Sequence, residues 1–312
     1  MSKIHLEGKA MGILRLGYLE IRVTEITQAA QYYTQVLGLK ETARAAGKVY
    51  LKAWDEWEHH QLVLVEDSSP GLSYMAFRLE SSDDLAFFEN KLERNGCRVE
   101  RVASADKYEI KEAIRFTAPS EHRVELYYDM KIVGNGLPTT NPPPYPDDLL
   151  GIHPPRMDHT LLTTADTPAS LHFWQEIMGF RLTEQVVTPE GIPLAIWLER
   201  TRTPHDLAFI PGKPGGLHHF AFWLDSWEEI GHAADVLARA GVQIDTGPTR
   251  HGITRGHTIY FFDSSGNRNE VFTGGYWADP RMTPITWTAD EMWTGIFYWD
   301  RREKGAFIAN YT

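Results

Sequence analysis

The feature that most constrains the fold of this chain is an internal repeat that relates its two halves. Residues 71–125 match residues 216–270 at a constant offset of 145 residues. Further upstream, an offset of 141 residues relates Gly38 to Gly179. A repeat of this length indicates a duplicated domain, because solenoid repeats have periods of about 20–50 residues.

Each half divides again into two similar units. Each unit is predicted to open with a strand, continue with a helix and add about three strands. We expect the opening strands at residues 19–23, 74–79, 159–163 and 218–224. The chain is therefore predicted to be an α+β protein made of four βαβββ modules in two duplicated domains.

Two helices of the second half carry local start signals. Thr167 is predicted to cap a helix over residues 169–178. Ser226 and Glu229 form a capping box before a helix over residues 230–240. These signals place a helix after the opening strand of both modules in this half.

A stretch rich in proline and glycine separates the halves. Residues 134–153 are predicted to be a linker, because their prolines exclude a helix or a central strand. This linker divides an N-terminal domain, residues 1–133, from a C-terminal domain, residues 154–275. Residues 276–312 have no counterpart in the first half. This aromatic tail could cover a pocket or a subunit contact, or close the core.

Charge and composition exclude several functions. The 312 residues carry a formal net charge of −11, which argues against broad binding to nucleic acid or to anionic membranes. Cys97 is the single cysteine, so no intrachain disulfide framework exists, and we interpret this residue as a small buried side chain. The sequence shows no apolar signal core and no membrane-spanning stretch. We therefore expect a soluble, cytoplasmic protein.

The two halves differ where metal ligands would lie. The repeat aligns Tyr74 with His219 and Tyr18 with His159, and Glu270 follows in a later strand of the second half. Two imidazoles and one carboxylate on neighbouring strands can occupy one face of a metal ion and leave up to three positions open. Such sites are typical of non-haem Fe(II) enzymes. Zn²⁺ would suit hydrolysis or isomerisation better.

Neighbouring residues limit this interpretation. His218 points to the opposite face of the strand from His219, so the two cannot bind one metal. His218 either supports the site or is structural. Glu125 keeps the carboxylate of Glu270 in the half without these histidines, so a structural role for Glu270 stays open. We expect His257 to be exposed.

Three further residues are candidates for acid–base chemistry. His205 precedes a predicted strand, although His60 occupies its place in the first half. His251 and Tyr260 flank a turn and are specific to the second half, where Tyr260 aligns with Arg115. Histidine titrates near neutrality, and a tyrosine hydroxyl can bind a phenolic oxygen.

Several segments together resemble a known family. Thr249-Arg250-His251 and residues 259–270 closely resemble the signature of type I extradiol ring-cleavage dioxygenases, and above all that of catechol 2,3-dioxygenases. The resemblance extends to residues 156–159, 217–219 and 297–302 and covers essentially the whole chain. Ser264 departs from the pattern, which usually has proline there. Proline would only fix the turn, so we expect no loss of activity.

The resemblance implies the vicinal-oxygen-chelate fold, with one active site in the C-terminal half. It implies Fe(II) held by His159, His219 and Glu270. It also implies catalytic roles around the metal for His205, His251 and Tyr260. Ile253 and Thr254, in the loop after His251, are candidate substrate contacts together with His251 and Tyr260. A homotetramer is implied as well.

The implied reaction is extradiol cleavage of catechol, or of a substituted catechol, by O2. The product would be 2-hydroxymuconate semialdehyde, formed in the degradation of aromatic compounds. Three alternatives stay open at this point: a related Mn(II) or Fe(II) dioxygenase for another vicinal diol, a non-catalytic protein that binds aromatic compounds, and a glyoxalase-like zinc isomerase. The preferred ring substituent is not predicted.

Overall fold

The structure is a computed structural model that describes residues 12–103 and 108–312. The predicted lack of an apolar signal concerns N-terminal residues that lie outside this range. No helix among the described residues has the length and apolar character needed to cross a membrane.

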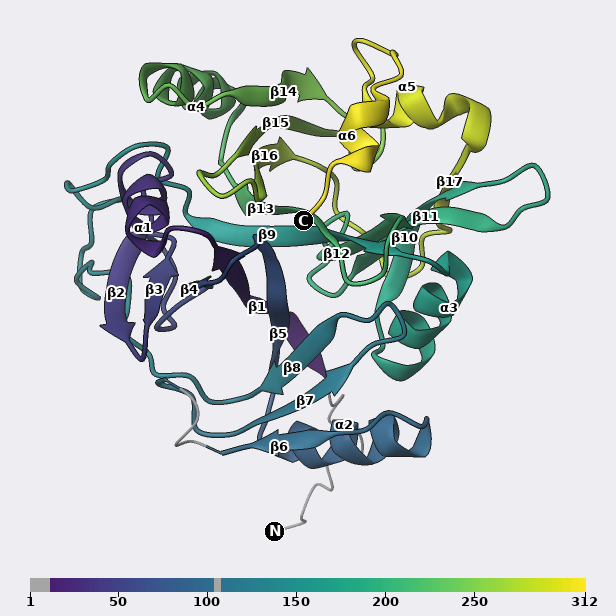
Figure 1. The fold of residues 1–312 in the computed structure, drawn as a ribbon, viewed down its shortest axis with the longest axis horizontal. Coiled ribbons are helices and arrows are strands. Elements are labelled where there is room, and N and C mark those ends of the chain that lie inside the picture. The colour runs from purple at the N-terminus through teal and green to yellow at the C-terminus, as the bar shows by residue number, and fades with distance from the viewer. Residues whose placement is uncertain (1–11, 104–107) are drawn as a thin grey trace.

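The described chain is built from four successive βαβββ modules, as predicted (Figure 1). The first contains β1 (Ile13–Val23), α1 (Ile26–Gln35), β2 (Lys40–Ala45), β3 (Lys48–Lys52) and β4 (Leu62–Glu66). The second contains β5 (Gly71–Leu79), α2 (Asp83–Arg94), β6 (Glu100–Val102), β7 (Ala113–Thr117) and β8 (Arg123–Tyr127). These two modules form one mixed sheet in the order β2-β3-β4-β1-β5-β8-β7-β6.

The second half repeats this arrangement. Its third module contains β9 (Arg156–Thr164), α3 (Thr167–His172), η2 (Phe173–Ile177), β10 (Arg181–Val187), β11 (Pro193–Glu199) and β12 (Leu207–Pro211). Its fourth contains β13 (Leu217–Trp223), α4 (Trp227–Arg239), β14 (Ile244–Arg250), β15 (Gly256–Phe262) and β16 (Arg268–Gly274). The sheet order is β14-β15-β16-β13-β9-β12-β11-β10-β17, so the opening strands β9 and β13 lie at its centre.

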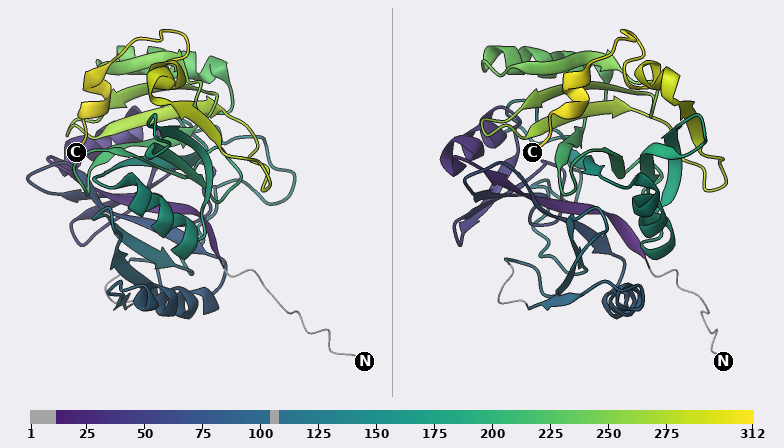
Figure 2. Two further views of the ribbon diagram at one scale, coloured as in Figure 1. Left: turned by 90° about the vertical axis from the view of Figure 1, so that its right-hand side faces the viewer. Right: turned by 45° about the vertical axis from the view of Figure 1, so that its right-hand side comes forward.

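The C-terminal tail adds to the second sheet and lies along its strands. It contains β17 (Ile285–Thr288), η3 (Ala289–Glu291), α5 (Met292–Ile296) and α6 (Gly305–Ala309). β17 pairs in parallel with β10 at the sheet edge. Figures 1 and 2 show this segment, in yellow, beside the strands of the second half. Leu217 and Thr312 exchange backbone hydrogen bonds of 2.7 and 3.0 Å, which tie the chain end to β13.

The two halves share one hydrophobic core. A single cluster of buried side chains contains residues from both sheets. Phe77 of β5 lies 5.5 Å from the ring of Trp174 and 5.4 Å from that of Phe180, measured between ring centroids. Tyr33 of α1 donates a 2.8 Å hydrogen bond to Asp263 in the other half. The halves therefore pack as one body, and β1 contacts β9 at their junction.

Two local predictions about the helices need correction. Asp166 caps α3, because its side chain accepts a hydrogen bond from the amide of Ala169, whereas Thr167 is already helical. The helix then continues as the π-helical segment η2 instead of one regular α-helix. Ser226 caps α4 as predicted, but Glu229 accepts from the amide of Asp225, so the reciprocal half of the capping box is shifted by one residue.

The predicted domain boundaries stay predictions. The first sheet ends at Tyr127 and the second begins at Arg156. Residues 134–153 between them contain no helix or strand. One strand of the tail, β17, belongs to the second sheet.

Candidate metal centre

The pairing of three central strands brings His159, His219 and Glu270 to one face of the second sheet. Ala221 of β13 is the register partner of His159 on β9 and of Glu270 on β16, so these residues form one row across the sheet. His219 lies two residues before Ala221 and therefore points to the same side. Strand register alone thus places the three side chains together.

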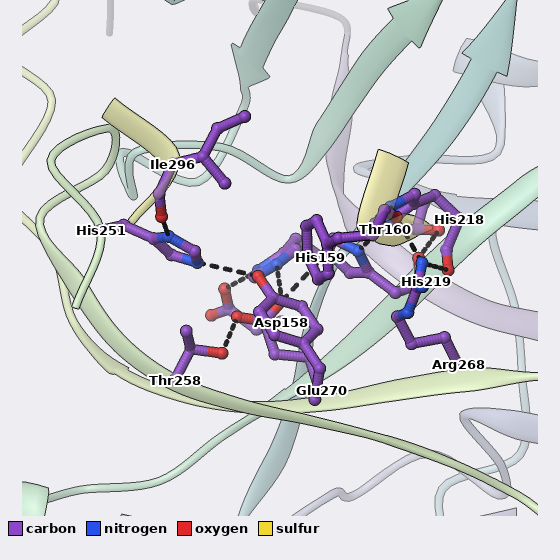
Figure 3. Close-up of polar contacts among 12 residues, drawn as sticks. Asp158, His159, Thr160, His218, His219, His251, Thr258, Arg268, Glu270 and Ile296 are labelled. Atoms are coloured by element: carbon purple, nitrogen blue, oxygen red, sulfur yellow. Dashed lines mark hydrogen bonds and ion pairs between the residues drawn. The ribbon is translucent and has the colours of Figure 1, made fainter. Parts of the chain in front are cut away.

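The three side chains converge on one point (Figure 3). The Nε2 atoms of His159 and His219 lie 3.1 and 3.0 Å from the same oxygen of Glu270, Oε2. The three possible ligand atoms all lie within 4.8 Å of one another. Each side chain is at most 3% exposed. Among the described residues, no second group of this kind occurs.

Hydrogen bonds on the outer side leave one ligand atom per residue facing the centre. Nδ1 of His159 lies 2.8 Å from Oδ2 of Asp158, and Nδ1 of His219 lies 2.7 Å from Nδ1 of His218. Thr258 donates to Oε1 of Glu270. A carboxylate behind a metal-binding histidine is a common second-sphere partner, because it fixes the tautomer that leaves Nε2 free. The donor set therefore fits a metal ion.

His218 connects His219 to the C-terminal tail. Nδ1 of His218 lies 2.7 Å from Nδ1 of His219, so one of these two nitrogens donates to the other. Nε2 of His218 lies 2.7 Å from the carbonyl oxygen of Phe307 and 2.9 Å from Nη1 of Arg268. Nη1 of Arg268 also donates to the carbonyl oxygen of Asn310 at 2.7 Å. His218 thus supports a proposed ligand and links it to the tail.

The three groups hold a proton where a cation would fit. Burial alone would lower the pKa of His159, but hydrogen bonds with Asp158 and Glu270 outweigh it and raise that pKa to about 9. Burial lowers the pKa of His219 to about 4. Burial would raise the pKa of Glu270, but the two histidines hold it well below its usual value. Metal binding to such groups releases protons.

The ring of His205 packs directly against that of His159. Their ring centroids are 3.9 Å apart, and His205 is 4% exposed. Burial holds the pKa of His205 well below its usual value, so the ring is neutral at pH 7. Within the described part of the chain, Nδ1 of His205 has no hydrogen-bond partner. A buried polar atom without a partner is costly, which indicates that this nitrogen serves a ligand.

His251 and Tyr260 form a pair at the other side of the site. Nε2 of His251 lies 2.8 Å from the hydroxyl oxygen of Tyr260. Nδ1 of His251 donates to the carbonyl of Ile296 in the tail, as Figure 3 shows. The Tyr260 ring lies 5.2 Å from that of His219. The structure therefore brings both predicted residues to the three proposed ligands.

A cavity of about 300 Å³ opens onto these groups. Ile253 and Thr254, the predicted substrate contacts, both line it and are 3% exposed. Tail residues close part of it, including Met292, Ile296, Phe307 and Ile308. Most of the remaining wall is apolar and comes from β9 to β12. The cavity is large enough for an aromatic ring, and the tail forms part of its wall.

Two predictions about single residues have different outcomes. His257 was predicted to be exposed, which is wrong: it is half-buried, with Nε2 2.7 Å from Nη1 of Arg250 and its ring 4.7 Å from that of Trp227. The sequence could not show this, because Trp227 belongs to a distant helix. Cys97 is partly buried against the core, and burial raises the pKa of its thiol, as expected for an unreactive side chain.

Sequence reasoning missed the partners that hold these groups in place. Thr258 precedes Tyr260 by two residues and therefore lies on the same face of β15, a signal that was available. Asp158 directly precedes a proposed ligand. Glu184 is buried beside the loop that follows His251, and no local motif marks it.

Comparisons with known proteins agree with this architecture. Residues 156–271 match the Glyoxalase/Bleomycin resistance protein/Dioxygenase superfamily, and residues 72–131 match the catechol 2,3-dioxygenase-like N-terminal domain. The chain is 40% identical to a metapyrocatechase from Pseudomonas sp. (strain CF600), over 96% of this chain and 99% of that protein. It is 30% identical to a manganese-dependent 2,3-dihydroxybiphenyl 1,2-dioxygenase from Geobacillus genomosp. 3, over 94% and 95%.

A solved structure is similar over most of the chain. The 2,3-dioxygenase LapB from Pseudomonas sp. KL28 superposes with a TM-score of 0.86 at 38% identity. The match covers 90% of this chain and 99% of that one. The predicted fold is thereby confirmed.

Proposed function

The chain belongs to the extradiol dioxygenases of the Glyoxalase/Bleomycin resistance protein/Dioxygenase superfamily, and we propose that it works with Fe(II) held by His159, His219 and Glu270. It is a catechol 2,3-dioxygenase, which opens the ring of catechol or a substituted catechol beside the two hydroxyls. The observation that carries the metal proposal is the shared oxygen Oε2 of Glu270, at 3.0–3.1 Å from two imidazole nitrogens.

A metal ion held by His159, His219 and Glu270 would supply a point at which catechol and O2 meet, and it would stabilise the negative charge of a deprotonated diol. The chain's own residues complete the site. Tyr260 and His251, already hydrogen-bonded to each other, are placed to bind a ring hydroxyl and to take up its proton. The neutral His205 is placed to hold a proton and to release it to oxygen as the ring opens. The product is 2-hydroxymuconate semialdehyde when catechol is the substrate.

We propose that the ring substituent of the preferred substrate is uncharged and apolar. Wall residues beyond the proposed ligands include Val186, Leu194, Ala195 and Ile210, and none of the described lining residues is lysine or arginine. The cavity of about 300 Å³ lies at the lower end of the roughly 300–1,000 Å³ typical of small-molecule sites, so a catechol ring with a small substituent fits. A carboxylate there would be desolvated without a partner. Rates for alkylcatechols and for 3,4-dihydroxyphenylacetate, compared on one preparation, test this preference.

The metal itself needs a separate experiment, because one relative is described as manganese-dependent. Metal-free protein should be loaded with Fe(II), Mn(II) or Zn²⁺ under reducing conditions and given catechol and O2. We expect O2 uptake and a yellow product with Fe(II). Turnover with Mn(II) but not with Fe(II) would show that Mn(II) is the active metal. Binding of catechol without O2 uptake with all three metals would contradict the proposed dioxygenase activity.

Assembly and location are proposed on other grounds. The resemblance to the family supports a homotetramer, and exposed aromatic residues such as Trp277 and Trp299, 72% and 55% exposed, are candidate subunit contacts. Light scattering of the purified protein measures the number of subunits. The single cysteine supports a reducing compartment such as the cytoplasm.

A further inference from the structure

A buried carboxylate outside the metal centre joins three separate segments of the second half. Glu184 lies on β10 and is 1% exposed. Oε1 accepts hydrogen bonds from the amide of Thr254 at 2.6 Å and from the hydroxyl of Tyr276 at 2.9 Å. Oε2 accepts from Nε1 of Trp287 at 2.9 Å. One donor belongs to the loop after His251, and the other two belong to the C-terminal tail.

The loop held by Glu184 carries the wall of the cavity and is strained. Thr254 and Arg255 have φ angles of +61° and +59°, in the left-handed region that β-branched and long side chains rarely adopt. Such a conformation persists only when the surroundings hold it. The short hydrogen bond from the amide of Thr254 to Glu184 fixes the loop at this point.

The same loop is bonded to the tail on its other side. The amides of Gly252 and Ile253 both donate to the carbonyl of Gly295, at 2.7 and 2.9 Å, and Nδ1 of His251 donates to the next carbonyl, that of Ile296. A Cβ atom on Gly252 would lie 2.9 Å from the ring of Trp287. The loop therefore packs tightly against the tail, and Glu184 accepts hydrogen bonds from both of these segments.

The first half lacks this carboxylate. The offset of 141 residues pairs Glu184 with Ala43, and each of the two residues follows an irregularity at the same point of its strand pair. A buried carboxylate is costly unless it is hydrogen-bonded, and burial raises the pKa of Glu184 even though its three donors act in the opposite direction. The buried carboxylate of Glu184, which costs free energy to desolvate, therefore occurs only in the half that carries the proposed active site.

We propose that Glu184 is a positioning residue that holds the loop of residues 251–255, and with it His251, against the C-terminal tail. This inference rests on the proposed function, because it concerns the placement of His251 beside Tyr260. The proposed ligands lie on β9, β13 and β16, so Glu184 acts on the second-sphere residues and on the cavity wall, and metal retention does not depend on it.

Glu184→Gln and Trp287→Phe, alone and together, test this role. Glutamine keeps the shape and one acceptor oxygen, but its amide group then faces the indole N–H, donor against donor. Trp287→Phe removes that N–H. Gln185→Ala is the matched control, because Gln185 links the same two strands, at 3.1 Å to Thr286, but on the exposed side. Activity is measured on metal-loaded full-length protein, and amide exchange is measured on the same protein with and without metal.

We expect Glu184→Gln to lower kcat for catechol by about tenfold to a hundredfold, the usual result of misplacing a catalytic group by an ångström. Metal content stays at the wild-type level. Hydrogen exchange of the Gly252 and Ile253 amides becomes faster in metal-free protein as well. The double variant recovers part of both losses, because the donor–donor contact is gone. Gln185→Ala changes none of these quantities.

Three outcomes overturn the inference. Wild-type amide exchange in Glu184→Gln would show that the carboxylate does not hold the loop. If the losses of kcat and of amide protection in the two single variants add up in the double variant, the two side chains contribute independently through packing and not through their hydrogen bond. Faster exchange with unchanged kcat would also refute the positioning role, and His251→Phe on the same assay then distinguishes the causes: unchanged kcat in that variant contradicts the proposed function of His251 itself.

Discussion

Nε of Arg115 lies 2.7 Å from Oε2 of Glu125, and these residues face each other across β7 and β8. Tyr260 and Glu270 are partners in the same way across β15 and β16. Tyr18 also donates to Glu125, through Oε1. In the first half, a guanidinium and a phenol thus satisfy the repeated carboxylate. In the second half, the imidazoles of His159 and His219 lie beside the carboxylate of Glu270, and the three groups can bind a cation.

Replacement of Arg115 by methionine should lower stability and leave the metal centre intact. The change leaves the buried Glu125 without its cation, which costs about 2–3 kcal/mol of the free energy of unfolding. Urea unfolding of the metal-free protein measures this loss. Metal content equal to wild type is the expected control result; a fall in metal content would mean that the two halves are coupled.

Tyr260→Phe should lower kcat for catechol by about tenfold to a hundredfold, because it removes the hydroxyl that lies 2.8 Å from Nε2 of His251. The phenyl ring keeps the packing against Phe307, whose ring centroid is 4.9 Å away, so the fold and the metal content should not change. A double-mutant cycle with His251→Phe should be strongly non-additive, because the two side chains act as a pair. Independent effects would argue against a shared role.

His122 should make the protein less stable at low pH. It is buried between the halves, where Nε2 donates to the carbonyl of Gly216 at 3.0 Å, and burial lowers its pKa to about 4 from an ordinary 6.5. Below pH 6.5, His122 binds a proton in the unfolded chain but stays neutral in the folded chain until the pH approaches 4. The free energy of unfolding therefore falls by up to ~3 kcal/mol between pH 6.5 and 4, and levels off below that range.

His122→Gln provides the comparison for this pH effect. In the wild type, Nδ1 of His122 lies 3.0 Å from the hydroxyl oxygen of Ser120. Glutamine can still donate to Gly216 and accept from Ser120, but it does not titrate. Urea unfolding of both proteins from pH 7 to pH 4 measures the difference, which removes the contribution of other titrating groups. Parallel curves for the two proteins would show that His122 is not responsible.

The repeat explains why so much of the fold was predictable. Each module contains a strand, a helix and alternating strands, and the helices of the second half are also capped by side chains. The two sheets follow from repeated pairing of β1 with β5 and of β9 with β13. The repeat also singled out His159 and His219, because tyrosines stand at their places in the first half. The structure brings these residues together with Glu270, and strand register alone accounts for it.

The supporting contacts were not predictable, because they join distant segments. Glu184 meets Trp287 from a strand more than a hundred residues away, and His218 meets the carbonyl of Phe307 in the tail. The local pattern also predicted the wrong cap for α3. Asp166 accepts the hydrogen bond from the amide of Ala169, and Thr167 is already part of the helix. Tertiary contacts of this kind leave no periodic signal in a single sequence.

Metal content and O2 consumption, measured together on wild type, Glu270→Ala and Glu125→Ala, test the account most directly. Glu270→Ala removes the oxygen that lies within 3.1 Å of both imidazoles, so it should retain no iron and consume no O2 with catechol. Glu125→Ala should be less stable but keep its iron, because its carboxylate belongs to the half without histidine ligands. An active Glu270→Ala variant with a full complement of iron would contradict the central claim.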